Sequence, residues 1–239
     1  VVPTSASRRS SMRLWAKRSR LPRKSLRRRA TVSDEYDYKY DSLEDPYVYP
    51  GTQILRNKFG IKHQDLLFEL ESQITNSKFV KSKRSDDDIP TGNFDLKHLQ
   101  AVHKYLFGEL YDWAGEIRKQ GFISKGQSVF CFAPMIESYA RGIFSKMQRE
   151  NFSEMEVKQC ACRLAYYLSE VNALHPFREG NGRSTRLFFQ IFADKHGWTL
   201  SFEKISHVTL VEAMIESMNG SLVPLSELLE KCLSRQTST

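Results

Sequence analysis

The sequence predicts an all-α domain that carries one small β-hairpin. Apolar residues recur every three or four positions along most of the chain from Leu66 to Leu233, and this is the period of a helix with one buried face. Only the stretch from Gly121 to Phe132 shows short extended runs on either side of a turn-like centre. Hydrophobic residues make up 40% of the 239 positions, which is sufficient for a sizeable core.

Composition limits the classes of protein to which the chain can belong. No stretch approaches the roughly 20 consecutive apolar residues that a membrane-spanning helix needs. No apolar core of a signal peptide is found either. The 4 cysteines are scattered, which favours a reducing compartment over a disulfide scaffold. We therefore expect one large domain or two small ones, with no transmembrane segment.

The net charge of +8 comes from the first part of the chain. Of the 36 Lys and Arg residues, 11 lie in residues 1–30, which contain no Asp or Glu. The other 209 residues hold 25 basic and 28 acidic side chains, so they are mildly acidic. We expect residues 1–45, which are basic and then acidic and Tyr-rich, to form a flexible arm. The alternative to a solvated tail is contact of residues 8–29 with nucleic acid or an anionic membrane.

Two helices are expected before the hairpin. Proline and glycine make residues 45–52 irregular. The first helix is marked by the apolar stripe of Leu66, Leu67, Leu70 and Ile74. The second begins at about Asp95, and the residues expected on its inward face are Leu96, Leu99, Val102, Leu106 and Leu110. His98 and His103 lie on the same helix, and we expect them at its surface or flank.

Further helices are expected after the hairpin. Pro134 suits the first turn of a helix, and its expected inward residues are Ile136, Tyr139, Ile143 and Met147. Ser153–Glu156 has the pattern of a capping box and predicts the start of the helix that leads to His175. The elements expected near the end of the chain are an extended run at 198–202 and helices at 207–218 and 224–233.

The stretch from His175 to Arg186 contains the residue types that phosphate-transfer chemistry requires. His175 is an imidazole that can take a proton near neutral pH. Pro176 ends the preceding helix and so leaves His175 at a turn. Glu179 is a lone carboxylate, which suits a Mg²⁺ ion completed by phosphate oxygens and water.

An anion site is expected directly after Glu179. Gly180–Gly182 allows close approach of the backbone to a ligand, and a helical pattern begins at once. The N–H groups and the positive dipole end of that helix attract phosphate. Arg183 and Arg186 are three positions apart, so both guanidinium groups are expected on one side of the helix.

The stretch resembles the signature of the Fic family, H-x-F-x-[D/E]-G-N-G-R-x-x-R. Every specified position is filled, by His175, Phe177, Glu179, Gly180, Asn181, Gly182, Arg183 and Arg186. Two further segments are similar to the family: residues 45–61, which resemble the lead-in to Fic domains, and residues 110–118, which precede its active-site flap. The resemblance extends over roughly residues 46–233, which we expect to form one Fic-type helical domain followed by a tail at 234–239.

The resemblance implies transfer of AMP from ATP, bound with Mg²⁺, to a Ser, Thr or Tyr hydroxyl of a target protein. His175 would deprotonate the acceptor hydroxyl, and Glu179 would hold Mg²⁺. The residues implied in nucleotide binding are Phe177, Gly180, Asn181, Gly182, Arg183 and Arg186. Phe177 would anchor the loop in the core, whereas the glycines, Asn181 and the arginines would contact phosphates.

The hairpin corresponds to the flap that, in this family, pairs with an extended segment of the target. The residues expected to bind the target are Phe122, Ile123, Ser124, Lys125 and Gly126. An ordinary surface hairpin is the alternative. A zinc pair of His175 and Glu179 is disfavoured, because Pro176 spoils helical spacing and no third ligand stands nearby.

Other readings of function remain open at the level of sequence. The enzyme could transfer a different phosphate-containing group, or the chain could be a binding protein that acts through its basic arm and has a vestigial site. Relatives include bacterial toxins and secreted effectors, which implies the bacterial cytoplasm, or the host cytoplasm after secretion.

Many Fic proteins carry an inhibitory helix with the pattern [S/T]-x-x-x-E-[G/N]. No complete match is found, since Thr31…Glu35 is followed by Tyr36 and Ser226…Glu230 by Lys231. We therefore expect that a small antitoxin-like protein, not the chain itself, supplies an inhibitory Glu to Arg186.

Overall fold

A computed structural model describes residues 38–40, 45–83, 89–119, 121–125 and 128–236. The expected basic arm, the flap residue Gly126 and the last three residues of the tail lie outside these ranges. The described residues from Lys39 onward belong to one compact unit.

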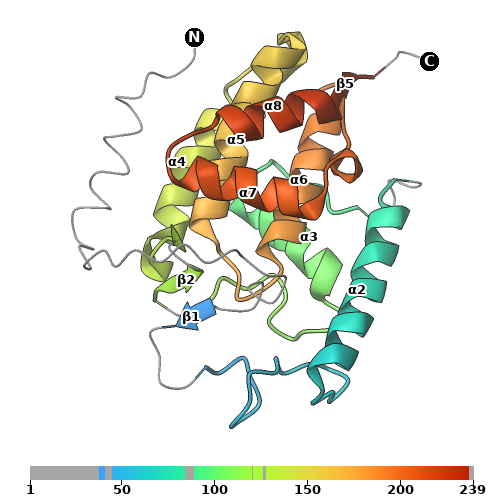
Figure 1. The fold of residues 1–239 in the computed structure, drawn as a ribbon, viewed down its shortest axis with the longest axis vertical. Helices are drawn as coiled ribbons and strands as arrows, with labels where there is room; N and C mark the ends of the chain where they lie inside the picture. Colours follow the sequence, from blue (N-terminus) through green and yellow to red (C-terminus); the bar gives the residue numbers. More distant parts are fainter. Residues whose placement is uncertain (1–37, 41–44, 84–88, 120, 126–127, 237–239) are drawn as a thin grey trace. The chain divides into compact units, whose positions relative to one another are not determined.

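Helices dominate the described residues, which confirms the predicted fold class (Figure 1). The long helices are α2 (Gln64–Lys81), α3 (Leu96–Phe107), α4 (Ile136–Met147), α5 (Val157–Leu174), α6 (Asn181–Lys195), α7 (His207–Met218) and α8 (Val223–Cys232). Short 3₁₀ turns are η2 (Ala133–Met135), η3 (Phe152–Glu154) and η4 (Phe202–Lys204). Among the described residues, none of the helices combines the length and the apolar character that a membrane span requires.

The strands form two small sheets. The predicted hairpin consists of β2 (Ile123–Lys125) and β3 (Ser128–Val129), with Ser124 opposite Val129 and Lys125 opposite Ser128. A further strand, β1 (Tyr38–Tyr40), gives this sheet the order β1-β2-β3. The second sheet pairs β4 (Trp198–Leu200) with β5 (Leu233–Arg235) in antiparallel fashion.

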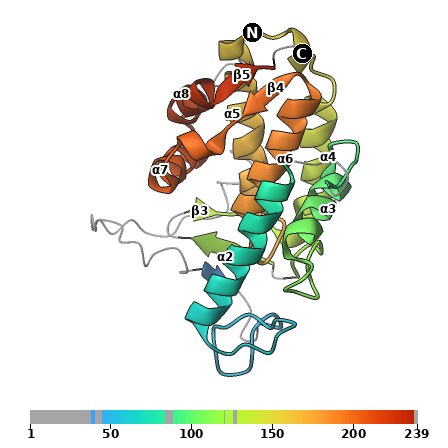
Figure 2. The same ribbon diagram turned by 90° about the vertical axis from the view of Figure 1, so that its right-hand side faces the viewer.

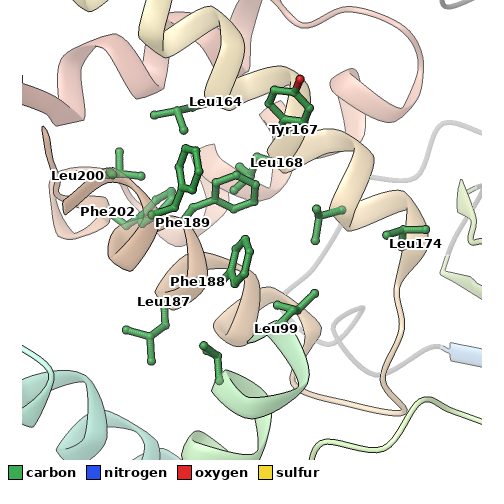
Figure 3. Close-up of a cluster of buried hydrophobic side chains, with 14 of the residues drawn as sticks. Leu99, Leu164, Tyr167, Leu168, Leu174, Leu187, Phe188, Phe189, Leu200 and Phe202 are labelled. Atoms are coloured by element: carbon green, nitrogen blue, oxygen red, sulfur yellow. The ribbon is translucent and has the colours of Figure 1, made fainter. Parts of the chain in front are cut away.

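Helix α5 lies at the centre of the packing. It contacts α8 and α7 on one side and α4 on the other, and it also packs against α6 (Figure 2). Figure 3 shows the buried cluster that joins α5 to α6 and α3, built from side chains such as Leu168, Phe188 and Leu99. Phe188 is fully buried, and truncation of such a ring costs about 3–5 kcal/mol. The core therefore fixes α5 and α6, the two helices between which the signature lies.

Three expectations from the sequence are wrong in detail. The capping-box pattern at Ser153–Glu156 does not start α5, which begins at Val157. Phe152 is buried and its carbonyl accepts a hydrogen bond from Trp198 Nε1 (2.9 Å), so the residues around it form η3 instead. His98 and His103 are buried at 3% and 0% exposure, not at the surface or flank of α3. Leu66 and Tyr139, expected to face inward, are exposed at 56% and 37%.

The exposure of Leu66 follows from the way in which α2 faces the rest of the domain. Its buried residues are Leu67, Glu71 and Thr75, which recur every four positions. Two of the three are polar, so this face of α2 meets a polar region as well as core.

Candidate active site

The signature forms a tight loop between α5 and α6. Two left-handed residues delimit this loop, His175 (φ 44°) at the C-cap of α5 and Gly180 (φ 78°) at the N-cap of α6. A Cβ atom at Gly180 would lie 2.4 Å from the ring of Phe107, so this position needs glycine for its conformation and for its space. Because L-residues rarely adopt the left-handed region, the conformation of His175 requires support from its surroundings.

Asn181 closes the loop from within. Its Oδ1 accepts from the N–H of Phe177 (2.9 Å), and its Nδ2 donates to the carbonyl of Phe177 (2.8 Å). The ring of Phe177 is fully buried and stacks on His103 at 3.9 Å between centroids. In the structure the amide of Asn181 therefore shapes the loop, and Phe177 anchors it.

The first turn of α6 offers a place for an anion. The first helical hydrogen bond is donated by Ser184 to Gly180 (3.0 Å), so the N–H groups of Asn181, Gly182 and Arg183 precede the helical ladder. Gly182 is exposed, and a Cβ atom there would lie 3.5 Å from Nη1 of Arg186. The guanidinium of Arg186 thus lies over this turn, where it adds positive charge to the helix dipole.

His175 lies beneath the hairpin. The residue is 5% exposed, and its ring stacks on Phe130, with the two centroids 3.7 Å apart. Burial, and then the positive charges of Arg118 and Lys125, lower the pKa of His175 to about 3. The imidazole is consequently neutral at physiological pH, the form that can accept a proton.

Glu179 is the carboxylate of the loop. Its Oε1 accepts a hydrogen bond from the N–H of Gly180 (2.7 Å) and lies 3.8 Å from Nη2 of Arg183. Burial raises the pKa of this carboxyl group, although the charge of Arg183 opposes the effect. The described residues contain no group of three or more His, Cys, Asp or Glu that could hold a metal. A lone carboxylate fits Mg²⁺, which retains water and takes its other ligands from phosphate.

Arg183 points toward α2. Its Nη2 lies 2.5 Å from Oε1 of Glu71, whose carboxylate also accepts a hydrogen bond from the hydroxyl of Tyr111. The guanidinium lies over the ring of Phe107 at 4.7 Å. These contacts fix Arg183, and they were not anticipated from the sequence. The polar residues on the buried face of α2 are the signal that could have revealed Glu71.

His103 is a second residue that sequence reasoning misplaced. Its Nδ1 accepts from the N–H of Gly115 (2.8 Å), so its Nε2 carries the proton and donates to the carbonyl of Glu179 (2.9 Å). Burial lowers the pKa of His103 to about 3 and keeps the ring neutral. The residue thereby connects α3 to the loop that carries the carboxylate.

The hairpin is held against the end of α5. Cys131 donates its N–H to the carbonyl of Ala173 (2.9 Å), and Phe130 donates to Ile123 (3.0 Å). Ile123 is buried, Ser124 and Lys125 are partly exposed, and Phe122 is exposed at 46%. The structure therefore brings the hairpin to His175, while the rest of the signature lies in the loop and the first turns of α6.

Comparison with known proteins identifies the family. A model of the Fic/DOC family matches residues 93–193. The probable protein adenylyltransferase y4lH of Sinorhizobium fredii is 35% identical over 192 residues, which cover 79% of this chain and 95% of that protein. The chain belongs to the Fic/DOC family. Its Fic fold is shared with the solved structure of BepC, a VirB-translocated effector of Bartonella tribocorum with bound AMPPNP, at a TM-score of 0.74 and 26% identity.

Other relatives of this Fic/DOC chain cover it to a similar extent. Its match to BepC covers 80% of this chain and 97% of BepC. A Fic domain of Bartonella quintana with bound ADP superposes with a TM-score of 0.73 and 25% identity. The match covers 80% of this chain and 95% of that domain. Protein adenylyltransferase VbhT of Bartonella schoenbuchensis is 36% identical over 200 residues, which are 83% of this chain but 41% of VbhT.

Proposed function

We propose that this protein adenylyltransferase transfers AMP from ATP to a Ser, Thr or Tyr hydroxyl of a target protein through the loop from His175 to Arg186. The observation that carries the proposal is the position of the hairpin directly over His175, with Phe130 stacked on the imidazole. A neutral base, a phosphate-binding helix terminus and an element that can hold a polypeptide thus meet at one loop. The AMPPNP and ADP in the two Bartonella structures support an adenine nucleotide as substrate.

His175 acts as the general base in this mechanism. Neutral imidazole accepts the hydroxyl proton as the acceptor oxygen forms a bond to the α-phosphorus of ATP. The bond from that phosphorus to the bridging oxygen breaks, pyrophosphate leaves, and AMP remains on the acceptor. Because Phe130 stacks on the ring, the acceptor has to enter beside or in place of this side chain.

The nucleotide phosphates are held by the first turn of α6. Backbone N–H groups of residues 181–183 and the guanidinium groups of Arg183 and Arg186 supply donors and positive charge. Glu179 would hold Mg²⁺, which, when bound, neutralises charge on the phosphates and on the departing pyrophosphate. Phe177 and Asn181 keep the loop in the shape that presents these groups.

The target is expected to bind as an added strand along β2. Ile123 accepts a hydrogen bond from Phe130, so its backbone groups face β3, and those of the next residue, Ser124, face the outer edge. The strand order β1-β2-β3 supports this role of β2, because the edge of β2 that faces away from β3 already pairs with another strand, β1. A target strand would replace β1. The flap residues with this role are Phe122, Ile123, Ser124, Lys125 and Gly126.

We extend the proposal to the organisation and setting of the protein. Residues 1–45 would form an arm, 46–233 the Fic domain and 234–239 a tail. A separate small inhibitory protein would place a Glu on Arg186. The protein would act in the bacterial cytoplasm or, as for the translocated effector BepC, after secretion into a host cell.

Radiolabelled ATP tests the reaction directly. The protein is incubated with a cell lysate, Mg²⁺ and ATP labelled on either the α- or the γ-phosphate. Only bands that are absent from lysate without the added protein are counted. AMP transfer predicts such bands with the α-label only, and none with His175→Ala, whose AMPPNP affinity should stay near that of the wild type. Bands of this kind with the γ-label would establish phosphate transfer, and bands of this kind with His175→Ala would refute the role of the base.

A further inference from the structure

We propose that Arg118 is a positioning residue that holds the flap hairpin and His175 in a fixed relation to each other. The inference rests on the proposed function, because it concerns how target and base are brought together. Arg118 lies between α3 and β2, is 2% exposed, and is not part of the signature. No contact of this residue with nucleotide or target is required for the role.

Among the described residues, Arg118 donates to four backbone carbonyls, two in the signature loop and two at the base of the hairpin. Its backbone N–H donates to the carbonyl of Pro176 (2.8 Å), and its side-chain Nε donates to the carbonyl of His175 (2.8 Å); both acceptors lie in the signature loop. Its Nη1 donates to Gly121 (3.2 Å), and its Nη2 donates to Cys131, on the two sides of the hairpin. One buried side chain therefore joins the base of the hairpin to the backbone of the catalytic residue.

The contact with His175 gives its backbone carbonyl a hydrogen-bond donor that helix α5 itself does not provide. His175 is left-handed and caps α5, so its carbonyl points out of the helical ladder and needs another donor. The guanidinium supplies that donor and places a positive charge at the negative end of the helix dipole. Loss of this contact would free the backbone of His175 to leave its left-handed conformation.

The contacts with Gly121 and Cys131 close the hairpin at its base. These residues lie just before β2 and just after β3, and the chain continues from Cys131 to a hydrogen bond with Ala173 on α5. The planar fork of arginine can reach carbonyls in several fixed directions, whereas the single ammonium of lysine cannot. A lysine at this position would keep the charge but would no longer join loop and hairpin.

The consequence for catalysis is one of alignment. The target would be held by β2, whereas the proton would be taken by His175, and Arg118 sets the distance between them. Misplacement of reacting groups by about 1 Å reduces rates by about 100-fold. Nucleotide binding should be spared, because the phosphates are held by α6, Arg183 and Arg186.

The experiment compares Arg118→Lys and Arg118→Met with the wild type. We measure the rate of AMP incorporation into lysate proteins at saturating ATP, and the affinity for AMPPNP with Mg²⁺. Both variants should lose about 100-fold in rate, with AMPPNP affinity retained within about two-fold. The matched control is Arg235→Met, since Arg235 also donates to two carbonyls, of Ser153 and Met155 (both 2.8 Å), but on β5. Its rate should equal that of the wild type.

Hydrogen–deuterium exchange provides a second readout that needs no activity. In Arg118→Lys, peptides within residues 121–132 and 174–178 should exchange faster, while peptides from α6 to α8 exchange as in the wild type. The proposal is overturned if both regions keep wild-type exchange, if the labelling rate stays within about two-fold, or if rate and AMPPNP affinity fall together. If the wild type itself transfers no AMP, the proposed function fails, and the exchange data alone decide whether Arg118 joins hairpin and loop.

Discussion

Buried histidines with lowered pKa values should make this protein sensitive to acid. His175 and His103 each have a pKa of about 3 in the folded state, chiefly because burial disfavours the imidazolium form. In the unfolded chain both return to the ordinary value of 6.5. Between these values the unfolded state binds more protons than the folded state, so the free energy of unfolding falls as the pH falls. The perturbation that isolates one of them is His175→Ala.

The size of the effect follows from the two pKa values. For one such histidine, lowering the pH from about 7.5 to about 5 should decrease the free energy of unfolding by about 2 kcal/mol. Over this interval the wild type should therefore lose about 2 kcal/mol more of its free energy of unfolding than His175→Ala. His103 and His98, whose pKa values burial also lowers, are present in both proteins and cancel in the comparison. Glu179 acts in the opposite sense, because burial raises its carboxyl pKa. It is present in both proteins and so cancels in the comparison.

Urea unfolding followed by tryptophan fluorescence measures this difference, because Trp113 and Trp198 are buried. The titrations are carried out in chelator at several pH values, and the readout is the change of stability with pH, not its level. A core variant, Leu164→Ala, is the control, since it lowers stability but removes no titrating group. Identical pH dependence for the wild type and His175→Ala would refute the claim that this imidazole is buried and neutral.

Three further changes test other parts of the site. Glu179→Ala should abolish the Mg²⁺ dependence of AMP transfer together with most activity, because the loop offers a single carboxylate; an unchanged Mg²⁺ titration would contradict this. Ser124→Pro should reduce target labelling far more than AMPPNP binding, because it removes an outward N–H from β2, whereas Ser124→Ala keeps that N–H and should behave as the wild type. Glu71→Gln should lower stability by about 1–3 kcal/mol and strengthen AMPPNP binding, because phosphate then replaces the missing partner of Arg183. Calorimetric titration that shows weaker binding would mean that Glu71 assists the nucleotide.

Helix boundaries could be predicted from the sequence where nearby residues alone determine them. Asp95 caps α3 by accepting from the N–H of His98 (2.9 Å), at the start predicted for that helix. The range of α7 was predicted correctly, and α8 begins and ends one residue earlier than expected. In each case the apolar period and a capping or helix-breaking residue lie within a few positions of each other, so no distant partner is needed.

Structure that depends on distant partners could not be predicted. The capping-box pattern at Ser153–Glu156 failed because burial of Phe152 and its bond to Trp198 decide the local backbone. His103 has its partners at Gly115 and Glu179, and neither can be inferred from the spacing within α3. Local sequence patterns and helix propensities are weak predictors at such positions, because tertiary contacts override them.

Arg183 shows how the same limitation affects the interpretation of function. The sequence places it on the same side of α6 as Arg186, and the resemblance to the Fic family implies that both arginines bind phosphates. The structure gives Arg183 a carboxylate partner from α2, Glu71, at 2.5 Å. A guanidinium withdrawn from water requires an anion, and Glu71 supplies one. If Arg183 binds phosphate as proposed, binding of ATP there would exchange one anion for another, and the free energy gained would be the difference between phosphate and Glu71. The proposed inhibition by a Glu from a separate protein would act on Arg186 instead. It would weaken ATP binding in addition to the competition between phosphate and Glu71 at Arg183. Helix α2, which the sequence shows only as an amphipathic segment, therefore contributes a partner to the signature arginine Arg183, and under the proposed function it would influence nucleotide binding.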